Sequence, residues 1–263
     1  MHEDGWRDFH RRWSRLKPPL RANCEVTASI GSAIEERRRH ALLLGVTPEL
    51  SAVADQTTAV DWSPGMIAHI WPGDTPSRRA VLGDWRAMPL ERREFSAAIG
   101  DGSLNSICLG DYGAVFAQLE RLLQPGARLA VRAYVTPDSC ESVAQVRRST
   151  MAGDAGGFHA FKWRLAMAIV AEQHQADLAV ARIHHVFEAE FPDRAALARA
   201  TGWSREDIEE IDAYRGVDTV YSFPTRREIR DMIPPGFRSV QFLASGTYEL
   251  AGRCPIVVAD FAS

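Results

Sequence analysis

The chain has 263 residues, of which 46% are hydrophobic and 25% charged, a composition typical of a globular protein and not of a disordered chain, a collagen or a coiled coil. Its apolar runs, such as 165–171 and 256–259, are much shorter than the roughly 20 residues that cross a bilayer, so no membrane-spanning segment is expected. The formal net charge of −3 argues against a protein that binds nucleic acid over its whole surface, because such proteins usually carry a basic excess.

The N-terminal 40 residues are predicted to form a helical cap. A first helix is expected over 4–16, because large apolar side chains recur there every three or four positions: Trp6, Phe9, Trp13 and Leu16. A Pro-Pro pair ends this helix, and a second helical stretch is expected over 25–39. The cationic side chains of this segment are interpreted as a solvated helix face.

Strand and helix signals then alternate from residue 41 to residue 135. The predicted strands are 41–45, 57–60, 80–82, 95–99 and 127–135. Helices are predicted to start at Thr47 and to span 63–70 and 112–123. This order implies a parallel sheet with right-handed crossovers and with helices on both faces.

Residues 136–235 break this rhythm, because they are mainly helical and show no strand signal before 219–222. Two apolar stripes are interpreted as packing faces: Phe158, Phe161, Leu165 and Ile169 in one, and Val180, Ile183, Phe187 and Phe191 in the other. Two final β runs, 238–243 and 255–261, are expected to pair as an antiparallel ribbon at one edge of the sheet.

The predicted fold is an α/β, Rossmann-like, mostly parallel seven-stranded sheet with helices on both faces, an antiparallel C-terminal strand and a helical insertion. Residues 41–135 and 236–263 form its core, and 136–235 form an insertion that serves as a substrate lid. Open parallel sheets bind ligands at the carboxyl ends of their strands, so the ends of the predicted strands are the candidate site.

The first two strand ends suggest a nucleoside. The first strand ends at Gly45, where backbone can approach a ligand closely, and Thr47-Pro48 has the pattern of a helix start with free N–H groups. The second ends at Asp61, at about the spacing at which a carboxylate accepts both hydroxyls of an adenosine ribose. A strand-end aspartate is about as often a helix cap, and that alternative stays open for Asp61.

The next two strand ends carry similar signals. Gly83-Asp84 places a carboxylate where it could accept a hydrogen bond from an exocyclic amine such as that of adenine. The segment 100–102 is a Gly-Asp-Gly turn at which the polar tail of a ligand could meet bare backbone.

Taken in chain order, these residues resemble the core of a class I S-adenosylmethionine-dependent methyltransferase. The matching segments are 41–49, 60–66, 81–90, 95–104 and 119–130. The sequence departs from the family at its first motif: Leu43 holds the acidic position, and Thr47 and Glu49 replace two glycines. Because Gly45 and the helix start remain, we interpret the chain as a methyltransferase with a modified loop.

The resemblance implies S-adenosylmethionine as the cofactor. Asp61 would hold the ribose hydroxyls, Trp62 and Met66 would pack against the adenine unless they are core residues, and Asp84 with the Trp85 amide would contact its edge. The segment 100–102 would line the methionine portion together with Gly45. The implied cofactor-binding residues are Gly45, Thr47, Pro48, Asp61, Trp62, Met66, Gly83, Asp84, Trp85, Gly100, Asp101 and Gly102.

Two residues are candidate general bases. Asp101 lies next to the position that the resemblance implies for the methyl group, and His159 begins a helix of the insertion, although a lone histidine is more often a surface or boundary residue. A base is optional here, because the methyl donor is already activated. No metal site is predicted: His184-His185 lacks the HExxH pattern, and the four cysteines form no CxxC pair.

The predicted function is S-adenosylmethionine-dependent methyl transfer to an unidentified small-molecule acceptor, because the insertion that would cover the cleft is rich in aromatic residues. Two alternatives remain. One is a non-catalytic sensor or carrier of the cofactor. The other, ranked last, is an NAD-dependent oxidoreductase, because the sequence lacks the GxGxxG motif of that class. A homodimer through aromatic side chains of the insertion is a further expectation. A cytoplasmic location is expected, because the first residues do not resemble a secretion signal.

Overall fold

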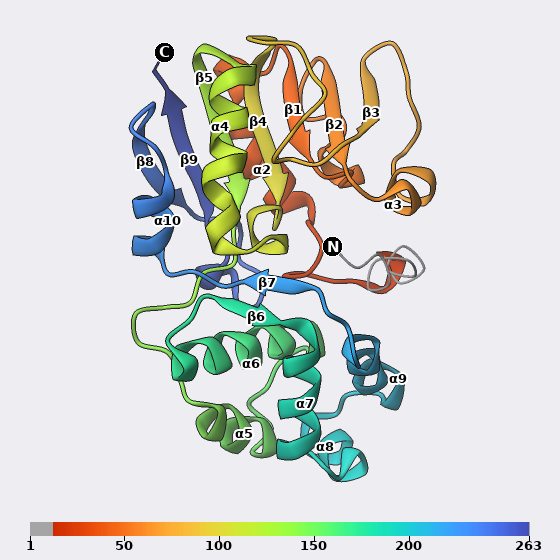
Figure 1. The fold of residues 1–263 in the computed structure, drawn as a ribbon. Coiled ribbons are helices and arrows are strands. Elements are labelled where there is room, and N and C mark those ends of the chain that lie inside the picture. The colour runs from red at the N-terminus through yellow and green to blue at the C-terminus, as the bar shows by residue number, and fades with distance from the viewer. Residues whose placement is uncertain (1–12, 263) are drawn as a thin grey trace.

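The computed structural model describes residues 13–262 and is built around one seven-stranded sheet (Figure 1). Its strands are β1 (Ala41–Leu44), β2 (Thr57–Asp61), β3 (Arg78–Leu82), β4 (Phe95–Asp101), β5 (Leu123–Arg132), β8 (Phe237–Leu243) and β9 (Ile256–Phe261). The order is β3-β2-β1-β4-β5-β9-β8, and β9 runs in the opposite direction to the other six strands of this sheet. The predicted mostly parallel sheet with an antiparallel C-terminal strand is confirmed.

Helices cover both faces of the sheet, as predicted. On one face the apolar sides of α4 (Tyr112–Leu122) and α10 (Arg226–Met232) pack against the strands, and on the other face lie α2 (Cys24–Ala33) and α3 (Pro64–His69). Strand β1 is entirely buried between these two layers, which explains its uninterrupted apolar sequence. The 3₁₀ turns of the described residues are η2 (Trp13–Arg15), η3 (Glu35–Arg37), η4 (Pro48–Leu50), η5 (Leu104–Ser106), η6 (Leu109–Asp111), η7 (Glu210–Tyr214) and η8 (Ala251–Arg253).

The insertion forms its own apolar core beyond the carboxyl ends of the parallel strands (Figure 1). Its helices are α5 (Val143–Met151), α6 (Phe158–Gln173), α7 (Val180–Glu190), α8 (Arg194–Thr201) and α9 (Arg205–Glu209). A two-stranded antiparallel ribbon of β6 (Asp177–Ala179) and β7 (Val220–Ser222) faces the sheet. Both predicted aromatic and aliphatic stripes are buried inside the insertion, so they are not available as the dimer surface that the sequence suggested.

Several predicted boundaries differ from the structure. Most of the expected first helix lies outside the described residues, and its last part is the 3₁₀ turn η2. The predicted helix after Thr47 is only the turn η4, and the Thr47 side chain makes no capping hydrogen bond. Strand β5 starts four residues earlier than expected, because Leu123 already pairs with Phe95 before a register shift. Within residues 13–262, no helix is both long enough and apolar enough to cross a membrane.

The chain enters and leaves the insertion at one point. Thr136 donates its N–H to the Pro224 carbonyl at 3.0 Å, so the outgoing and returning segments run side by side. The Asn105 amide group bonds to both segments: it donates to the carbonyls of Tyr134 at 2.8 Å and Ser222 at 2.7 Å, and its oxygen accepts from the Tyr134 N–H.

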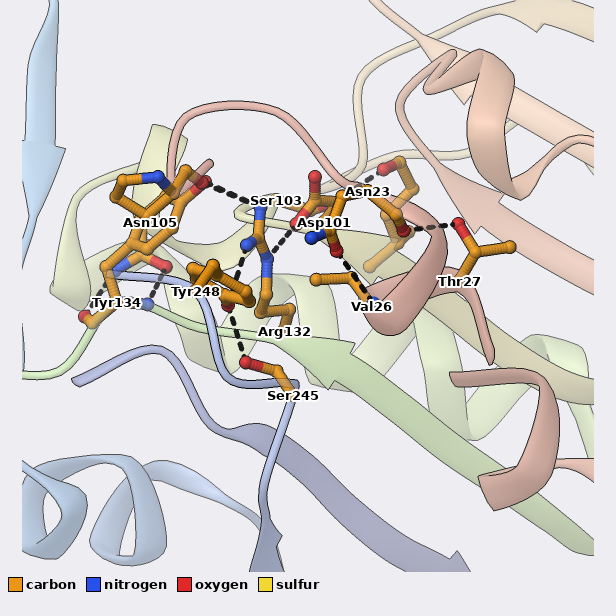
Figure 2. A network of polar contacts seen from close by, with 12 residues as sticks. Asn23, Val26, Thr27, Asp101, Ser103, Asn105, Arg132, Tyr134, Ser245 and Tyr248 are labelled. Atoms are coloured by element: carbon orange, nitrogen blue, oxygen red, sulfur yellow. Dashed lines mark hydrogen bonds and ion pairs between the residues drawn. The ribbon is translucent and has the colours of Figure 1, made fainter. Parts of the chain in front are cut away.

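A buried ion pair joins β4 and β5 at the end of the sheet that faces the insertion. The register places Asp101 of β4 opposite Arg132 of β5, and their side chains form an ion pair. Arg132 has no exposed surface, and its guanidinium also donates to the Tyr248 hydroxyl at 2.9 Å and to the Pro19 carbonyl at 2.7 Å. Figure 2 shows this guanidinium between Asp101 and Tyr248. Burial by itself would lower the pKa of Arg132, but the Asp101 carboxylate raises it well above its usual value, so the guanidinium stays charged.

The loop that carries Tyr248 also joins the sheet to the insertion. Its Thr247 donates both N–H and hydroxyl to Glu25 at the start of α2. Its Glu249 accepts the Gly157 N–H at 2.6 Å, at the start of α6, a helix without a capping side chain of its own. One short loop therefore holds α2, the buried guanidinium and α6 together.

We predict that Arg132→Met destabilises the protein by about 3–5 kcal/mol, because it leaves the Asp101 carboxylate buried without its partner. Urea unfolding measures the change, and the double variant Asp101→Asn/Arg132→Met should be more stable than Arg132→Met alone. The control is Arg205→Met, which removes an exposed pair with Glu209 and should cost less than about 0.5 kcal/mol. Equal stability of Arg132→Met and the wild type would contradict the role of the pair.

Candidate functional site

The main cavity lies at the carboxyl ends of the central strands. It has a volume of about 970 Å³ including its open mouth, and it continues from the sheet to the inner face of the insertion. At the sheet edge it is lined by Gly45, Val46, Thr47, Asp61, Asp101 and Gly102. The parallel register places these residues together, since Leu44 pairs with both Val60 and Gly100. This is the position at which open α/β sheets bind ligands.

Asp61 presents a desolvated carboxylate to this cavity. Its Oδ1 accepts the Ser63 N–H at 2.8 Å, which is the one hydrogen bond of this side chain among residues 13–262. Burial raises the pKa of Asp61 to about 6, and the Ser63 N–H only partly opposes this shift. The Oδ2 lies 3.9 Å from the position that a Cβ on Gly45 would take. Since Gly45 has a φ of +97° and no side chain, there is room beside this oxygen.

A second cavity of about 860 Å³ adjoins the first and shares Trp85 and Ser106 with it. Trp62 and Asp84 line this second cavity, whereas Asp61 lines the first. Asp61 and Asp84, which the resemblance assigns to one cofactor, therefore line two adjoining cavities. Trp85 forms the partition: its indole N–H donates to the Val60 carbonyl at 2.6 Å, and its ring passes 3.8 Å from the Cβ position of Gly45.

The Asp84 carboxylate already has a cationic partner within the protein. Arg86 donates to both of its oxygens, at 2.6 Å for the shortest contact, and also forms an ion pair with Asp111 at 3.0 Å. The hydrogen bonds from Arg86 lower the pKa of Asp84, so this carboxylate stays ionised. The sequence analysis did not anticipate Arg86.

The other predicted cofactor residues divide into two groups. Met66 lines the main cavity, together with the sheet-edge residues above. Pro48, Gly83 and Gly100 line neither cavity. Packing explains the glycine at position 100: a Cβ there would come within 2.4 Å of Ser103 Oγ, which donates to the Leu44 carbonyl at 2.6 Å.

The two predicted general bases lie in different surroundings. Asp101 lines the cavity, but its carboxylate is bonded to Arg132 and would lose this pair on accepting a proton. His159 lies outside the cavity lining, and its Nε2 is 3.3 Å from the Arg15 carbonyl. Burial, helped by the charge of Lys162, lowers the pKa of His159 to about 4, so it is neutral at pH 7.

The far end of the cavity contains residues that sequence reasoning missed. Aromatic side chains dominate this end: Trp13, Tyr134, Trp163, Tyr214, Tyr221 and Phe223. Trp163 lies at their centre, with ring centroids at 5.5 Å from Tyr134, 5.7 Å from Tyr221 and 5.2 Å from Phe223. Lys162 and Glu210 add one charge of each sign. The rarity of lysine, with only Lys17 and Lys162 in the chain, was the one signal that could have pointed to Lys162.

A group of three potential metal ligands lies away from both cavities. His184, Glu188 and Asp212 bring ligand atoms within 4.8 Å of one another. Arg194 donates to both carboxylates of this group and lowers the pKa of Asp212. Arg215 also donates to Asp212, at 3.0 Å, so two guanidinium groups balance the two carboxylates and the arrangement is that of a structural ion-pair cluster.

Asp61→Asn should stabilise the protein at pH 7. The ionised carboxylate is disfavoured by burial, and a pKa raised from 3.8 to about 6 corresponds to a cost on the order of 3 kcal/mol, whereas asparagine keeps the acceptor for the Ser63 N–H. The advantage of the variant should grow as the pH rises from about 4 to about 6 and then stay constant.

Thermal unfolding of both proteins between pH 4 and pH 8 measures this difference. Asp138→Asn, at an exposed position, serves as the matched control and should leave stability within about 0.5 kcal/mol of the wild type. A loss of stability in Asp61→Asn would show that the carboxylate is a structural cap.

Comparison with known proteins adds evidence at the level of the fold. No model of a known protein family matches the sequence, and no curated protein sequence does. Among solved structures, 1,6-didemethyltoxoflavin-N1-methyltransferase of Burkholderia thailandensis, with 1,6-didemethyltoxoflavin and S-adenosylhomocysteine bound, is 14% identical over 98% of this chain and 88% of that chain, with a TM-score of 0.53.

Two further solved structures are similar over nearly their whole length. A complex of the Trm112 methyltransferase activator of Haloferax volcanii with a putative methyltransferase gives 11% identity over 99% of this chain and 96% of that chain, with a TM-score of 0.52. A structure described as putative Zn-dependent alcohol dehydrogenases from Rhodobacter sphaeroides gives 9% identity over 99% and 96% of the chains, with a TM-score of 0.58.

The strand order of this chain differs from that of the classic dinucleotide-binding sheet. The classic dinucleotide-binding sheet has six parallel strands in the order 3-2-1-4-5-6. Here an antiparallel strand, β9, is inserted between β5 and β8. At the identities found, the similarity establishes the fold alone. This fold is the one predicted from the motif order of 41–135, and the chain has the fold of the class I S-adenosylmethionine-dependent methyltransferases.

Proposed function

We propose that this protein binds S-adenosylmethionine and transfers its methyl group to a small-molecule acceptor. The main support is the continuity of the cavity: it begins at the buried Asp61 carboxylate on the sheet edge and ends among aromatic side chains of the insertion. One chamber thus offers a polar site for a nucleoside and an apolar site for a second molecule. Open α/β sheets bind ligands at the carboxyl ends of their strands, which supports a nucleoside at this end of the cavity.

The residues at the sheet edge fit the cofactor. No group of residues 13–262 donates to the second oxygen of Asp61, which lies next to the space left by Gly45, and a pair of ribose hydroxyls would satisfy it. Thr47 and Gly102 would line the methionine portion. Trp62 and Asp84 would surround the adenine in the second cavity. Because the Trp85 ring separates the two cavities, we propose that this side chain moves when the adenosine binds.

The chain's own contribution to the reaction would be alignment and exclusion of water. The sulfonium of the cofactor supplies an activated methyl group, which an acceptor atom displaces in line. Asp61 would fix the nucleoside, and the aromatic walls around Trp163 would hold the acceptor and keep the chamber dry. Holding two reactants in this way can contribute roughly 7–11 kcal/mol. Asp101 would help to orient the reactants and would not act as a base, because its carboxylate is bonded to Arg132.

Cofactor affinity should depend on pH through Asp61. We expect the dissociation constant of S-adenosylhomocysteine to rise by up to about tenfold for each pH unit below 6, because the ribose hydroxyls donate to the ionised carboxylate. In Asp61→Asn the affinity should be at least about tenfold lower at pH 8 and nearly independent of pH. Isothermal titration calorimetry from pH 5 to pH 8 measures both proteins, with Asp138→Asn as control. An unchanged affinity in Asp61→Asn would show that Asp61 does not bind the cofactor.

Calorimetry with S-adenosylmethionine, S-adenosylhomocysteine and NAD tests the function itself. We expect the first two to bind and NAD not to bind. Formation of S-adenosylhomocysteine with a panel of aromatic acceptors then tests turnover. Binding of NAD alone would support the oxidoreductase alternative, and cofactor binding without turnover on any acceptor would support a sensor.

A further inference from the structure

The sheet-edge end of the main cavity carries two carboxylates. Asp61 is the last residue of β2 and Asp101 the last residue of β4, and both side chains line the cavity. The register places them at the same level on either side of β1, because Leu44 pairs with both Val60 and Gly100. Two strand spacings put their Cα atoms about 10 Å apart. A nucleoside held by Asp61 therefore has a second anionic group within reach of its 5′ substituent.

The Asp101 carboxylate is positioned to make a further contact. Its side chain is 3% exposed, and among residues 13–262 the one group that donates to it is the Arg132 guanidinium, at Oδ1. Arg132 itself has no exposed surface and does not line the cavity. The pair is neutral in sum, but its anionic member is the one that borders the cavity. A cationic group of a ligand would therefore gain a charge-assisted hydrogen bond to the second oxygen of Asp101.

The same end of the cavity offers little to an anionic group of a ligand. Lys162, the one basic side chain among the described residues that line the cavity, lies at the opposite end, over the rings of Tyr214 and Phe158. The turn η4 after Thr47 has three residues and is too short to build the dipole of a helix. The Thr47 hydroxyl is a neutral donor. A carboxylate bound here would lose hydration without gaining a cationic partner.

S-adenosylmethionine ends in an ammonium and a carboxylate on the same carbon. We propose that this site binds the ammonium through Asp101 and does not require the carboxylate, so that decarboxylated S-adenosylmethionine binds at least as tightly as S-adenosylmethionine itself. The proposal rests on the proposed function for the position of the nucleoside at Asp61. From there the chain of the cofactor, through the sulfur and the carbons of its side chain to the nitrogen, can bridge the span between the two carboxylates.

A panel of adenosine thioethers tests the preference. S-adenosylhomocysteine carries both charged groups, S-adenosyl-3-thiopropylamine the ammonium alone, S-adenosyl-4-thiobutyrate the carboxylate alone, and 5′-methylthioadenosine neither. Isothermal titration calorimetry at pH 8 is expected to show the amine binding within about threefold of S-adenosylhomocysteine or tighter, and at least about tenfold tighter than the acid. A ratio below about tenfold between amine and acid, or an amine more than about threefold weaker than S-adenosylhomocysteine, would overturn the proposal.

Variants of the two aspartates assign the effect. Asp101→Asn keeps an oxygen that accepts from Arg132 and removes the charge, so it should weaken the binding of the amine by at least about tenfold and leave that of 5′-methylthioadenosine within about threefold. Asp61→Asn is the matched control and should weaken all the ligands by a similar factor, because they share the ribose. An Asp101→Asn variant that still prefers the amine would overturn the role of Asp101. If this variant does not fold, Asp101→Asn/Arg132→Met serves in its place, and the wild-type panel still decides the preference.

The same panel separates the failure of this proposal from the failure of the proposed function. If S-adenosylhomocysteine and 5′-methylthioadenosine bind but the amine and the acid bind equally, the nucleoside site remains and the role of Asp101 is rejected. If none of the adenosine thioethers binds, the proposed function is contradicted, and the ammonium site with it.

Discussion

A guanidinium without solvent contact must find all of its partners inside the protein, and Arg132 finds them in three segments that are distant from it in sequence. Its bonds reach Pro19 before α2, Asp101 at the end of β4, and Tyr248 in the loop before β9 (Figure 2). Because a missing partner would be costly, these segments can only be placed together. The floor of the main cavity is thereby fixed at the level of Asp101, and the insertion is joined to the sheet through the same cluster.

The cavity combines two unfavourable features that a purely structural protein would avoid. Asp61 carries a charge that burial disfavours, and Lys162 brings an ammonium among aromatic rings. Buried charged groups that line a cavity are typical of binding sites. Asp61 and Lys162 lie at opposite ends of one chamber.

Local sequence signals predicted the sheet well, because each central strand is an apolar run whose end is marked by glycine or aspartate. These signals failed where contacts between segments distant in sequence determine the structure. The partnership of Asp101 with Arg132 depends on the register of β4 and β5, and the three-residue strand β6 exists only through its ladder with β7. The Trp85 partition depends on a side-chain direction that no spacing rule gives. For the same reason the aromatic chamber, assembled from segments 200 residues apart, could be expected only in general terms.

The junction at Asn105 has an evolutionary consequence. One amide group holds the outgoing segment at Tyr134 and the returning segment at Ser222. The two ends of the insertion therefore lie side by side, like the two ends of a hairpin loop. Its length and shape can change without disturbing the strands, because neither end has to move. Related proteins can therefore differ in the whole insertion, and so in the far wall of the main cavity, while the strand ends at Gly45 and Asp61 stay the same.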